Sequence, residues 1–147
     1  IYDLFLDADR QYSCAYFRTP KDTLDQAQAQ KKAHIARKLL IEPGMRVLDI
    51  GCGWGGLALT LARDWGARVV GITLSREQLA VAQRRADEAG LSEQVEFRLQ
   101  DYREVTEIFD RVVSVGMFEH VGLPNYATYF RKVRDRLTPD GVALIHT

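Results

Sequence analysis

Residues 47–56 read Val47-Leu48-Asp49-Ile50-Gly51-Cys52-Gly53-Trp54-Gly55-Gly56, and this stretch decides the fold of the chain. An apolar run typical of a buried strand leads directly into four glycines within six residues, and a helix-like segment follows. Glycine allows a tight turn from strand to helix, and it also lets a ligand approach the main chain. The density of glycines favours a ligand-binding loop over a turn that serves the fold alone.

Strand-like and helix-like segments alternate along the whole chain. Short apolar runs indicate strands buried on both faces, at residues 46–50, 68–72, 94–99, 111–115 and 142–146. Helical spacing and end caps predict helices at residues 23–40, 56–65, 76–89 and 125–137, with a turn at 139–141 before the last strand. The alternation predicts an α/β fold with a parallel sheet, whose ligands bind at the carboxyl ends of the strands.

Composition narrows the class of protein. The 147 residues include 20 Lys and Arg and 20 Asp and Glu, so a nucleic-acid partner bound by charge alone is not expected. No apolar run is long enough to span a bilayer, no signal-peptide pattern is present, and Cys14 and Cys52 match no disulfide or zinc spacing. We therefore expect a cytoplasmic protein without a metal site. Because the chain begins with Ile1 and stops inside an apolar run, we expect a piece of a longer protein.

The glycine loop fits S-adenosylmethionine better than a dinucleotide. Gly51, Gly53 and Gly56 satisfy the dinucleotide pattern, but that site also requires an acidic residue about 20 positions further on, where residues 71–74 are Gly-Ile-Thr-Leu. Asp49, two residues before the first glycine, would repel a pyrophosphate and attract an ammonium and a sulfonium.

Polar residues at the predicted ends of the second and third strands extend this site. Asp101 can accept a hydrogen bond from an adenine amino group and Tyr102 can lie on the ring; alternatively, Asp101 caps the next short helix. Thr73 and Gln78 can reach a ribose, although Gln78 equally completes a capping box with Ser75.

An ordered set of segments resembles the cyclopropane fatty acid and mycolic acid cyclopropane synthases. The segments are Tyr12-Ser13-Cys14-Ala15-Tyr16-Phe17, Val47–Gly56, Thr73-Leu74-Ser75 with Gln78, Gln100-Asp101-Tyr102-Arg103, Val115-Gly116-Met117-Phe118-Glu119-His120-Val121-Gly122 and His146-Thr147. Many methyltransferases share the glycine loop, whereas the first and fifth segments are far more specific. The resemblance implies a Rossmann-like class I methyltransferase fold with strand order 3-2-1-4-5, helices on both faces and strands 6 and 7 absent. It implies one domain over 1–147, with an N-terminal active-site segment and helix over 1–40 and the core over 41–147.

The resemblance also implies a reaction. The π bond of an unsaturated acyl chain, usually on a phospholipid, takes the methyl group of S-adenosylmethionine, a base removes a proton from that methyl, and a cyclopropane ring closes. The family's base is a bound bicarbonate ion, held at the positions of the Cys14 backbone, Glu119 and His146. The family's cofactor contacts fall on Tyr12, Ser13, Asp49, Gly51, Cys52, Gly53, Gly55, Thr73, Leu74, Gln78, Asp101 and Tyr102.

Several alternatives stay open. Glu119 can instead be a helix-capping or salt-bridged surface carboxylate, and the chain can instead methylate a lipid or small molecule, or bind cofactor without turnover. The basic run 31–38 is interpreted as a solvated helix end rather than as a contact for anionic lipid headgroups.

Two expectations concern partners. A phospholipid substrate implies transient contact with the inner face of the membrane. The last strand, with Val142, Leu144 and Ile145, is expected at an exposed apolar edge, which favours pairing with a second copy in a homo-oligomer.

Overall fold

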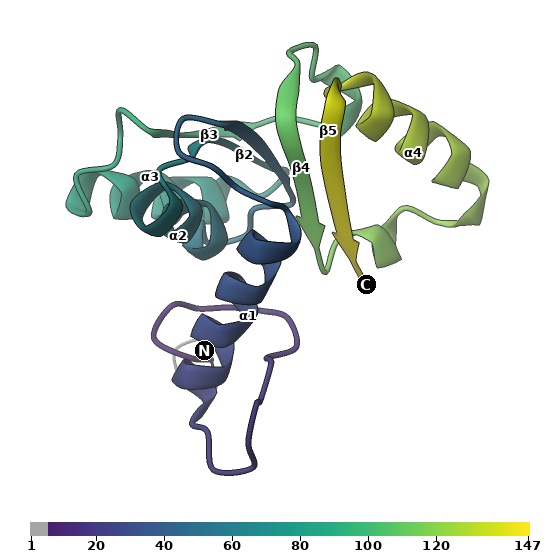
Figure 1. Ribbon diagram of the computed structural model, residues 1–147. Coiled ribbons are helices and arrows are strands. Elements are labelled where there is room, and N and C mark those ends of the chain that lie inside the picture. Colours follow the sequence, from purple (N-terminus) through teal and green to yellow (C-terminus); the bar gives the residue numbers. More distant parts are fainter. Residues whose placement is uncertain (1–5) are drawn as a thin grey trace.

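A parallel sheet in the order β3-β2-β1-β4-β5 forms the centre of the computed structural model, which describes residues 6–147 (Figure 1). The strands are β1 (Arg46–Ile50), β2 (Arg68–Thr73), β3 (Val95–Leu99), β4 (Phe109–Val115) and β5 (Leu137–His146). Each neighbouring pair is parallel, so the predicted sheet and its order are confirmed.

Helices cover both faces of the sheet. They are α1 (Leu24–Lys38), α2 (Gly56–Trp65), α3 (Arg76–Glu88) and α4 (Tyr126–Asp135). Successive strand residues point to opposite faces, so Val47 joins a core with α1, α2 and α3, whereas Leu48 joins a core with Tyr129 and Val133 of α4. Short 3₁₀ turns follow the ends of β3 and β4, at Tyr102–Glu104, Phe118–His120 and Leu123–Asn125.

The local sequence explains where α1 and α2 begin. Thr23 and Gln26 form a capping box at the start of α1, each side chain accepting a hydrogen bond from the other's backbone N–H. Gly55 precedes α2 with φ of 85°, and a Cβ there would lie 2.7 Å from Phe97 Cζ. Only glycine fits this position without displacing the β3 side chain that packs on the loop.

The segment before the last strand differs from the prediction. β5 begins at Leu137, which pairs with Phe109, and the next aligned pair is Val142 with Arg111. Three more residues on β5 than on β4 separate these pairs, so residues 139–141 form an irregularity inside the strand rather than a turn before it.

The basic run 31–38 is not uniformly solvated, as the sequence interpretation had it. Lys31 and Lys32 are only 4% and 8% exposed, whereas Arg37 and Lys38 are exposed. The reason is helical geometry, since Lys31 lies one turn before Ile35 on the face of α1 that packs against the rest of the molecule. Within residues 6–147, no helix is both long and apolar enough to cross a membrane.

Candidate functional site

A cavity of about 810 Å³ lies at the carboxyl ends of the parallel strands. Four segments at the ends of β1, β2, β3 and β4 line it, at residues 49–54, 72–75, 100–103 and 115–117. The N-terminal segment and α1 contribute residues 10–13, Lys31 and Ile35. The arrowheads of β4 and β5 point toward the side where α1 and the N-terminal segment lie (Figure 1). The cavity is therefore where open α/β sheets bind their ligands.

Most of the residues expected to contact a cofactor line this cavity. The lining includes Tyr12, Ser13, Asp49, Gly51, Cys52, Gly53, Thr73, Leu74, Gln78, Asp101 and Tyr102. Gly55 is the exception, because it faces Phe97 and Ala82 and shapes the loop from behind.

Asp49 is a buried carboxylate at the bottom of the cavity. It is 1% exposed, and its Oδ2 atom has no hydrogen-bond partner among the described residues. Burial raises the pKa of Asp49 to about 7. An unpaired buried carboxylate is costly, so this position suits a ligand that brings a cationic hydrogen-bond donor.

The glycine loop brings its backbone close to two neighbouring strands. Gly51 has φ of 80°, and a Cβ on it would lie 2.9 Å from Met117 Cβ beyond the end of β4. The amides of Gly51 and Cys52 both donate to the Ile72 carbonyl at 3.0 Å. Burial raises the pKa of the Cys52 thiol, which fits a packing role and not a nucleophile.

The end of β2 is held by a local hydrogen-bond network. The Thr73 hydroxyl donates to Gln78 Oε1 at 2.9 Å and accepts from the Ser75 amide at 3.1 Å. The Ser75 hydroxyl accepts from the Gln78 amide at 3.2 Å, which caps α3. The predicted reciprocal capping box is wrong, because Thr73 takes both the Ser75 amide and the Gln78 side chain.

Asp101 caps the turn that follows β3, as one of its two interpretations held. Its carboxylate accepts from the Arg103 amide at 2.8 Å and from the Arg103 guanidinium at 2.6 Å. These hydrogen bonds hold the pKa of Asp101 below its ordinary value. Asp101 and Tyr102 also line the cavity, so capping and ligand contact are compatible.

The three residues expected to hold a bicarbonate flank the cavity. Among the described residues, Cys14, Glu119 and His146 are not part of its lining. Cys14 lies beside a smaller cavity of about 340 Å³, and Glu119 is exposed in the turn after β4. His146 ends β5 with Nδ1 buried and without a partner among residues 6–147, and its carbonyl accepts from the Gly116 amide at 3.0 Å. None of the three side chains therefore forms part of the wall of the large cavity.

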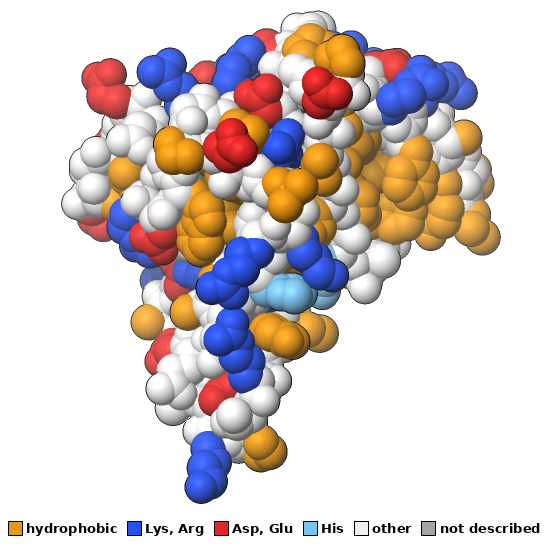
Figure 2. Space-filling view, in the orientation of Figure 1, with side chains coloured by type: hydrophobic (Ala, Val, Ile, Leu, Met, Phe, Trp, Pro, Cys, Tyr) orange, Lys and Arg blue, Asp and Glu red, His pale blue; other side chains and the backbone are white. Residues whose placement is uncertain are grey.

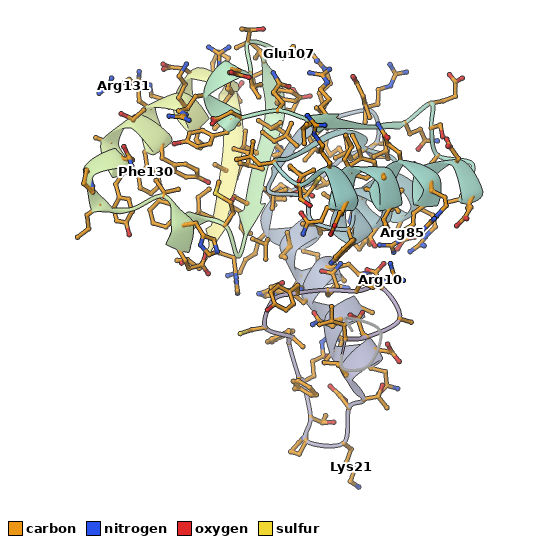
Figure 3. All side chains as sticks on the ribbon, turned by 180° about the vertical axis from the view of Figure 1, so that it is seen from behind. Arg10, Lys21, Arg85, Glu107, Phe130 and Arg131 are labelled. Carbon is orange, nitrogen blue, oxygen red and sulfur yellow. The ribbon has the colours of Figure 1, made fainter. Side chains whose placement is uncertain are left out.

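The sequence analysis missed how the N-terminal segment is fixed in place. The Asp9 carboxylate accepts hydrogen bonds from Lys32 on α1 and Arg85 on α3, and Arg85 also donates to the Trp54 carbonyl at 2.7 Å. Burial opposes ionisation of Asp9, but Lys32 and Arg85 outweigh it and lower the pKa of Asp9. Figure 3 labels Arg85 and Arg10 where α3 meets the N-terminal segment. Nothing in the spacing of Asp9 in the sequence signals this contact.

Lys31 and His120 also line the cavity and were not predicted as site residues. A usable signal existed for Lys31, since it precedes the apolar Ile35 by one helical turn.

The sheet order 3-2-1-4-5, the helices on both faces and the glycine loop over a cavity at the strand ends define the class I methyltransferase fold. The sequence model of the Mycolic acid cyclopropane synthetase family matches residues 1–147. The chain belongs to this family.

Three relatives illustrate the similarity. The chain is 52% identical to "Cyclopropane-fatty-acyl-phospholipid synthase" of Escherichia coli (strain K12), over 100% of this chain and 37% of the relative. It superposes with a TM-score of 0.95 and 38% identity on mycolic acid cyclopropane synthase CmaA1 complexed with SAH and CTAB, over 99% of this chain and 51% of that one. Coclaurine N-methyltransferase bound to N-methylheliamine and SAH gives a TM-score of 0.92 and 30% identity, over 99% of this chain and 43% of that one. The chain thus spans about 37% of the length of its E. coli relative.

Proposed function

We propose that this chain is the cofactor-binding part of an enzyme that transfers a methylene group from S-adenosylmethionine to the double bond of an unsaturated fatty acyl chain of a phospholipid, forming a cyclopropane ring. The observation that supports this most is Asp49 in the cavity beside the glycine loop: its buried Oδ2 has no hydrogen-bond partner among the described residues. The family membership and the phospholipid synthase named among the relatives support the reaction and the substrate.

The residues present fit S-adenosylmethionine, which supplies an electrophilic methyl group when bound. Asp49 would accept from the ligand's ammonium, and the glycine backbone leaves room for close approach. Thr73 and Gln78 would reach the ribose, while Asp101 and Tyr102 would contact the adenine. The remaining expected contacts on the cavity wall are Tyr12, Ser13, Gly51, Cys52, Gly53 and Leu74.

For the base, we propose that Glu119, His146 and the Cys14 backbone hold bicarbonate. In support, the buried Nδ1 of His146 at the end of β5 has no hydrogen-bond partner among residues 6–147, so it could bond to a ligand. Glu119 follows β4, next to β5 in the sheet, and would share a proton with the anion. A small anion can accept the proton of the substrate's new methyl group where a wall-bound carboxylate cannot reach.

To reach a phospholipid substrate, the enzyme would act as a peripheral protein at the cytoplasmic face of the inner membrane. The support is a run of exposed aromatic side chains, Tyr12, Tyr16 and Phe17, on the N-terminal segment beside the cavity. Exposed aromatic rings suit the boundary between headgroups and acyl chains.

Two measurements test the proposal. Calorimetry on the full-length protein is expected to show binding of S-adenosylmethionine or S-adenosylhomocysteine and none of NAD. Mass spectrometry of lipids from cells that express the full-length gene should show gain of one CH₂ unit with loss of the double bond. Binding of NAD without binding of the methyl donor would overturn the assignment.

A second candidate function is simple methylation of a lipid or small molecule. The 30% identity to coclaurine N-methyltransferase supports this second candidate, because that protein is named as a methyltransferase and not as a cyclopropane synthase. Products that carry a methyl branch or a methylated amine, and no ring, would select it. If the full-length protein binds the cofactor but forms no product, it is a binding module, which is the third candidate.

A further inference from the structure

Lys31 is a buried cation on the wall of the cavity. It projects from α1, is 4% exposed and lines the cavity. Its Nζ donates to Ser13 Oγ at 2.7 Å. Since the Ser13 oxygen accepts from Lys31, the hydroxyl proton is free to point to another acceptor.

No carboxylate forms a salt bridge with Lys31 within residues 6–147. Asp9 is occupied by Lys32 and Arg85, and Asp7 accepts from the amides of Asp9 and Gln11. Burial is the main reason that the pKa of Lys31 is lowered to about 8; the charge of Lys32 acts in the same direction, while Asp7, Asp9 and Cys14 act in the opposite one. A buried ammonium of this kind is stabilised by an anion that it can pair with.

The order of the strands places Lys31 at one part of the cavity. Asp101 follows β3 and Thr73 ends β2, whereas Asp49 lies in β1 and Gly116 follows β4, which neighbours β1 on the other side. Ser13 belongs with the second group, because a Cβ on Gly116 would lie 3.6 Å from Ser13 Cβ. Lys31, through Ser13, therefore lies at the end of the cavity away from Asp101.

The other cations on the wall are placed differently. Arg103 is paired with Asp101 at the β3 end. The Arg10 guanidinium lies over the Trp54 ring, 5.8 Å from its centroid. Lys31 is the wall cation for which the structure shows a hydrogen bond to Ser13.

We propose that Lys31 and the Ser13 hydroxyl bind the α-carboxylate of the methionine portion of S-adenosylmethionine, while Asp49 binds its α-ammonium. The inference rests on the proposed function and adds a binding residue to it. A zwitterionic amino-acid group needs an anion and a cation as partners. Within residues 6–147, this part of the cavity offers the Asp49 carboxylate, whose buried Oδ2 has no hydrogen-bond partner, and the buried ammonium of Lys31, which has no salt bridge. Charged hydrogen bonds on both groups would also fix the direction in which the ligand lies.

The test compares two ligands by calorimetry on the full-length protein. One is S-adenosylhomocysteine, and the other is the same thioether with its carboxyl group replaced by hydrogen. Lys31→Met is expected to lower the affinity for S-adenosylhomocysteine roughly 10- to 100-fold. The affinity for the decarboxylated ligand should fall less than about 3-fold. Equal losses for both ligands, or no loss for either, would overturn the proposal.

Lys32→Met is the matched control on the adjacent residue. Lys32 is also buried, but it pairs with Asp9 and does not line the cavity. Its substitution should change the affinities of the two ligands by the same factor. A larger loss for the carboxylated ligand in this variant than in Lys31→Met would contradict the role assigned to Lys31.

The unmutated protein provides a readout that does not depend on whether a variant folds. It should bind S-adenosylhomocysteine at least about 10-fold more tightly than the decarboxylated ligand. Equal affinities would sink the carboxylate site while leaving the proposed function intact. Binding of neither ligand would instead show that the proposed function itself is wrong.

Discussion

At the scale of single residues, two positions at the carboxyl end of β1 control the site: Asp49 within the strand and Gly51 just after it. Asp49 is a carboxylate whose burial raises its pKa to about 7, and Gly51 has a backbone conformation that side chains rarely adopt. The buried carboxylate of Asp49 is unfavourable for folding, and the backbone conformation at position 51 restricts which residue can stand there. Both become useful if a cationic ligand approaches the main chain at this point.

We expect the affinity for S-adenosylhomocysteine to depend on pH through Asp49. Affinity should increase as the pH rises from about 6 to about 7.5, because Asp49 ionises while the ligand's amine stays largely protonated. Asp49→Asn should lower the affinity at pH 7.5 roughly 10-fold or more and flatten this dependence. Calorimetry at several pH values measures both effects, and an unchanged pH profile in the variant would contradict them.

The same carboxylate should destabilise the ligand-free fold at higher pH. The folded pKa of about 7 exceeds the ordinary value of 3.8, so the unfolded chain loses its proton first and the stability falls as the pH rises between these values. Ligand-free Asp49→Asn should therefore be more stable than the unmutated protein at pH 8 in urea denaturation. A less stable variant would show that Asp49 has a stabilising partner.

Gly51→Ala should disrupt the loop by steric clash as well as by strain. A Cβ at Gly51 would lie 2.9 Å from Met117 Cβ, whereas a Cβ at Gly44, with a similar φ of 85°, meets nothing within 4 Å. Gly44→Ala should cost about 1 kcal/mol, and Gly51→Ala about 1–3 kcal/mol more, with weaker cofactor binding. Urea denaturation measures the difference, and equal costs would contradict the clash.

At the scale of elements, the N-terminal segment is attached to the helices by ion pairs. Asp9 joins α1 through Lys32 and α3 through Arg85, and Arg85 also holds the Trp54 carbonyl of the glycine loop. One cluster therefore joins the segment that carries Tyr12 and Ser13 to the glycine loop, and both line the cavity.

Arg85→Met should loosen this attachment. The partly buried pair with Asp9 suggests a loss of about 1–3 kcal/mol of unfolding free energy, together with weaker binding of S-adenosylhomocysteine. Arg63→Met is the control, since Arg63 forms an exposed pair with the adjacent Asp64 and should cost less than about 0.5 kcal/mol. If both variants lose equal stability and affinity, the cluster has no special role.

At the scale of the whole molecule, the exposed edge and one apolar surface are notable. β5 lies at the edge of the sheet, next to β4, and its Ala143 is exposed. Hydrophobic side chains gather over α4 (Figure 2). Phe130 of α4 is 50% exposed, and Leu123 in the turn before α4 is 79% exposed. Unpaired strand edges and large apolar patches are the surfaces through which chains associate.

We expect the 147-residue chain to self-associate in solution. Light scattering should show species larger than a monomer at high concentration, and Ala143→Lys should reduce them because a charge on an edge strand opposes pairing. The exposed position should make the substitution nearly neutral for stability. A chain that stays monomeric at high concentration would contradict the proposed homo-oligomer.

Local sequence determined much of the fold and one wall of the site. Short apolar runs between capped helices specify a parallel sheet, and the glycines after Asp49 specify a tight turn, because both depend on neighbours along the chain. Thr73 ends one strand and Asp101 follows another, so their presence at the cavity could be inferred from the topology alone.

Only the tertiary structure decided which residues meet across the cavity. Lys31 contacts Ser13, Asp9 contacts Arg85 from 76 positions away, and neither Cys14 nor His146 lines the large cavity. A basic residue in a helix looks the same in sequence whether water or another segment covers it. Its burial, its partner and its pKa depend on the packing of α1 against the sheet and the N-terminal segment, and that packing is set by contacts between distant parts of the chain.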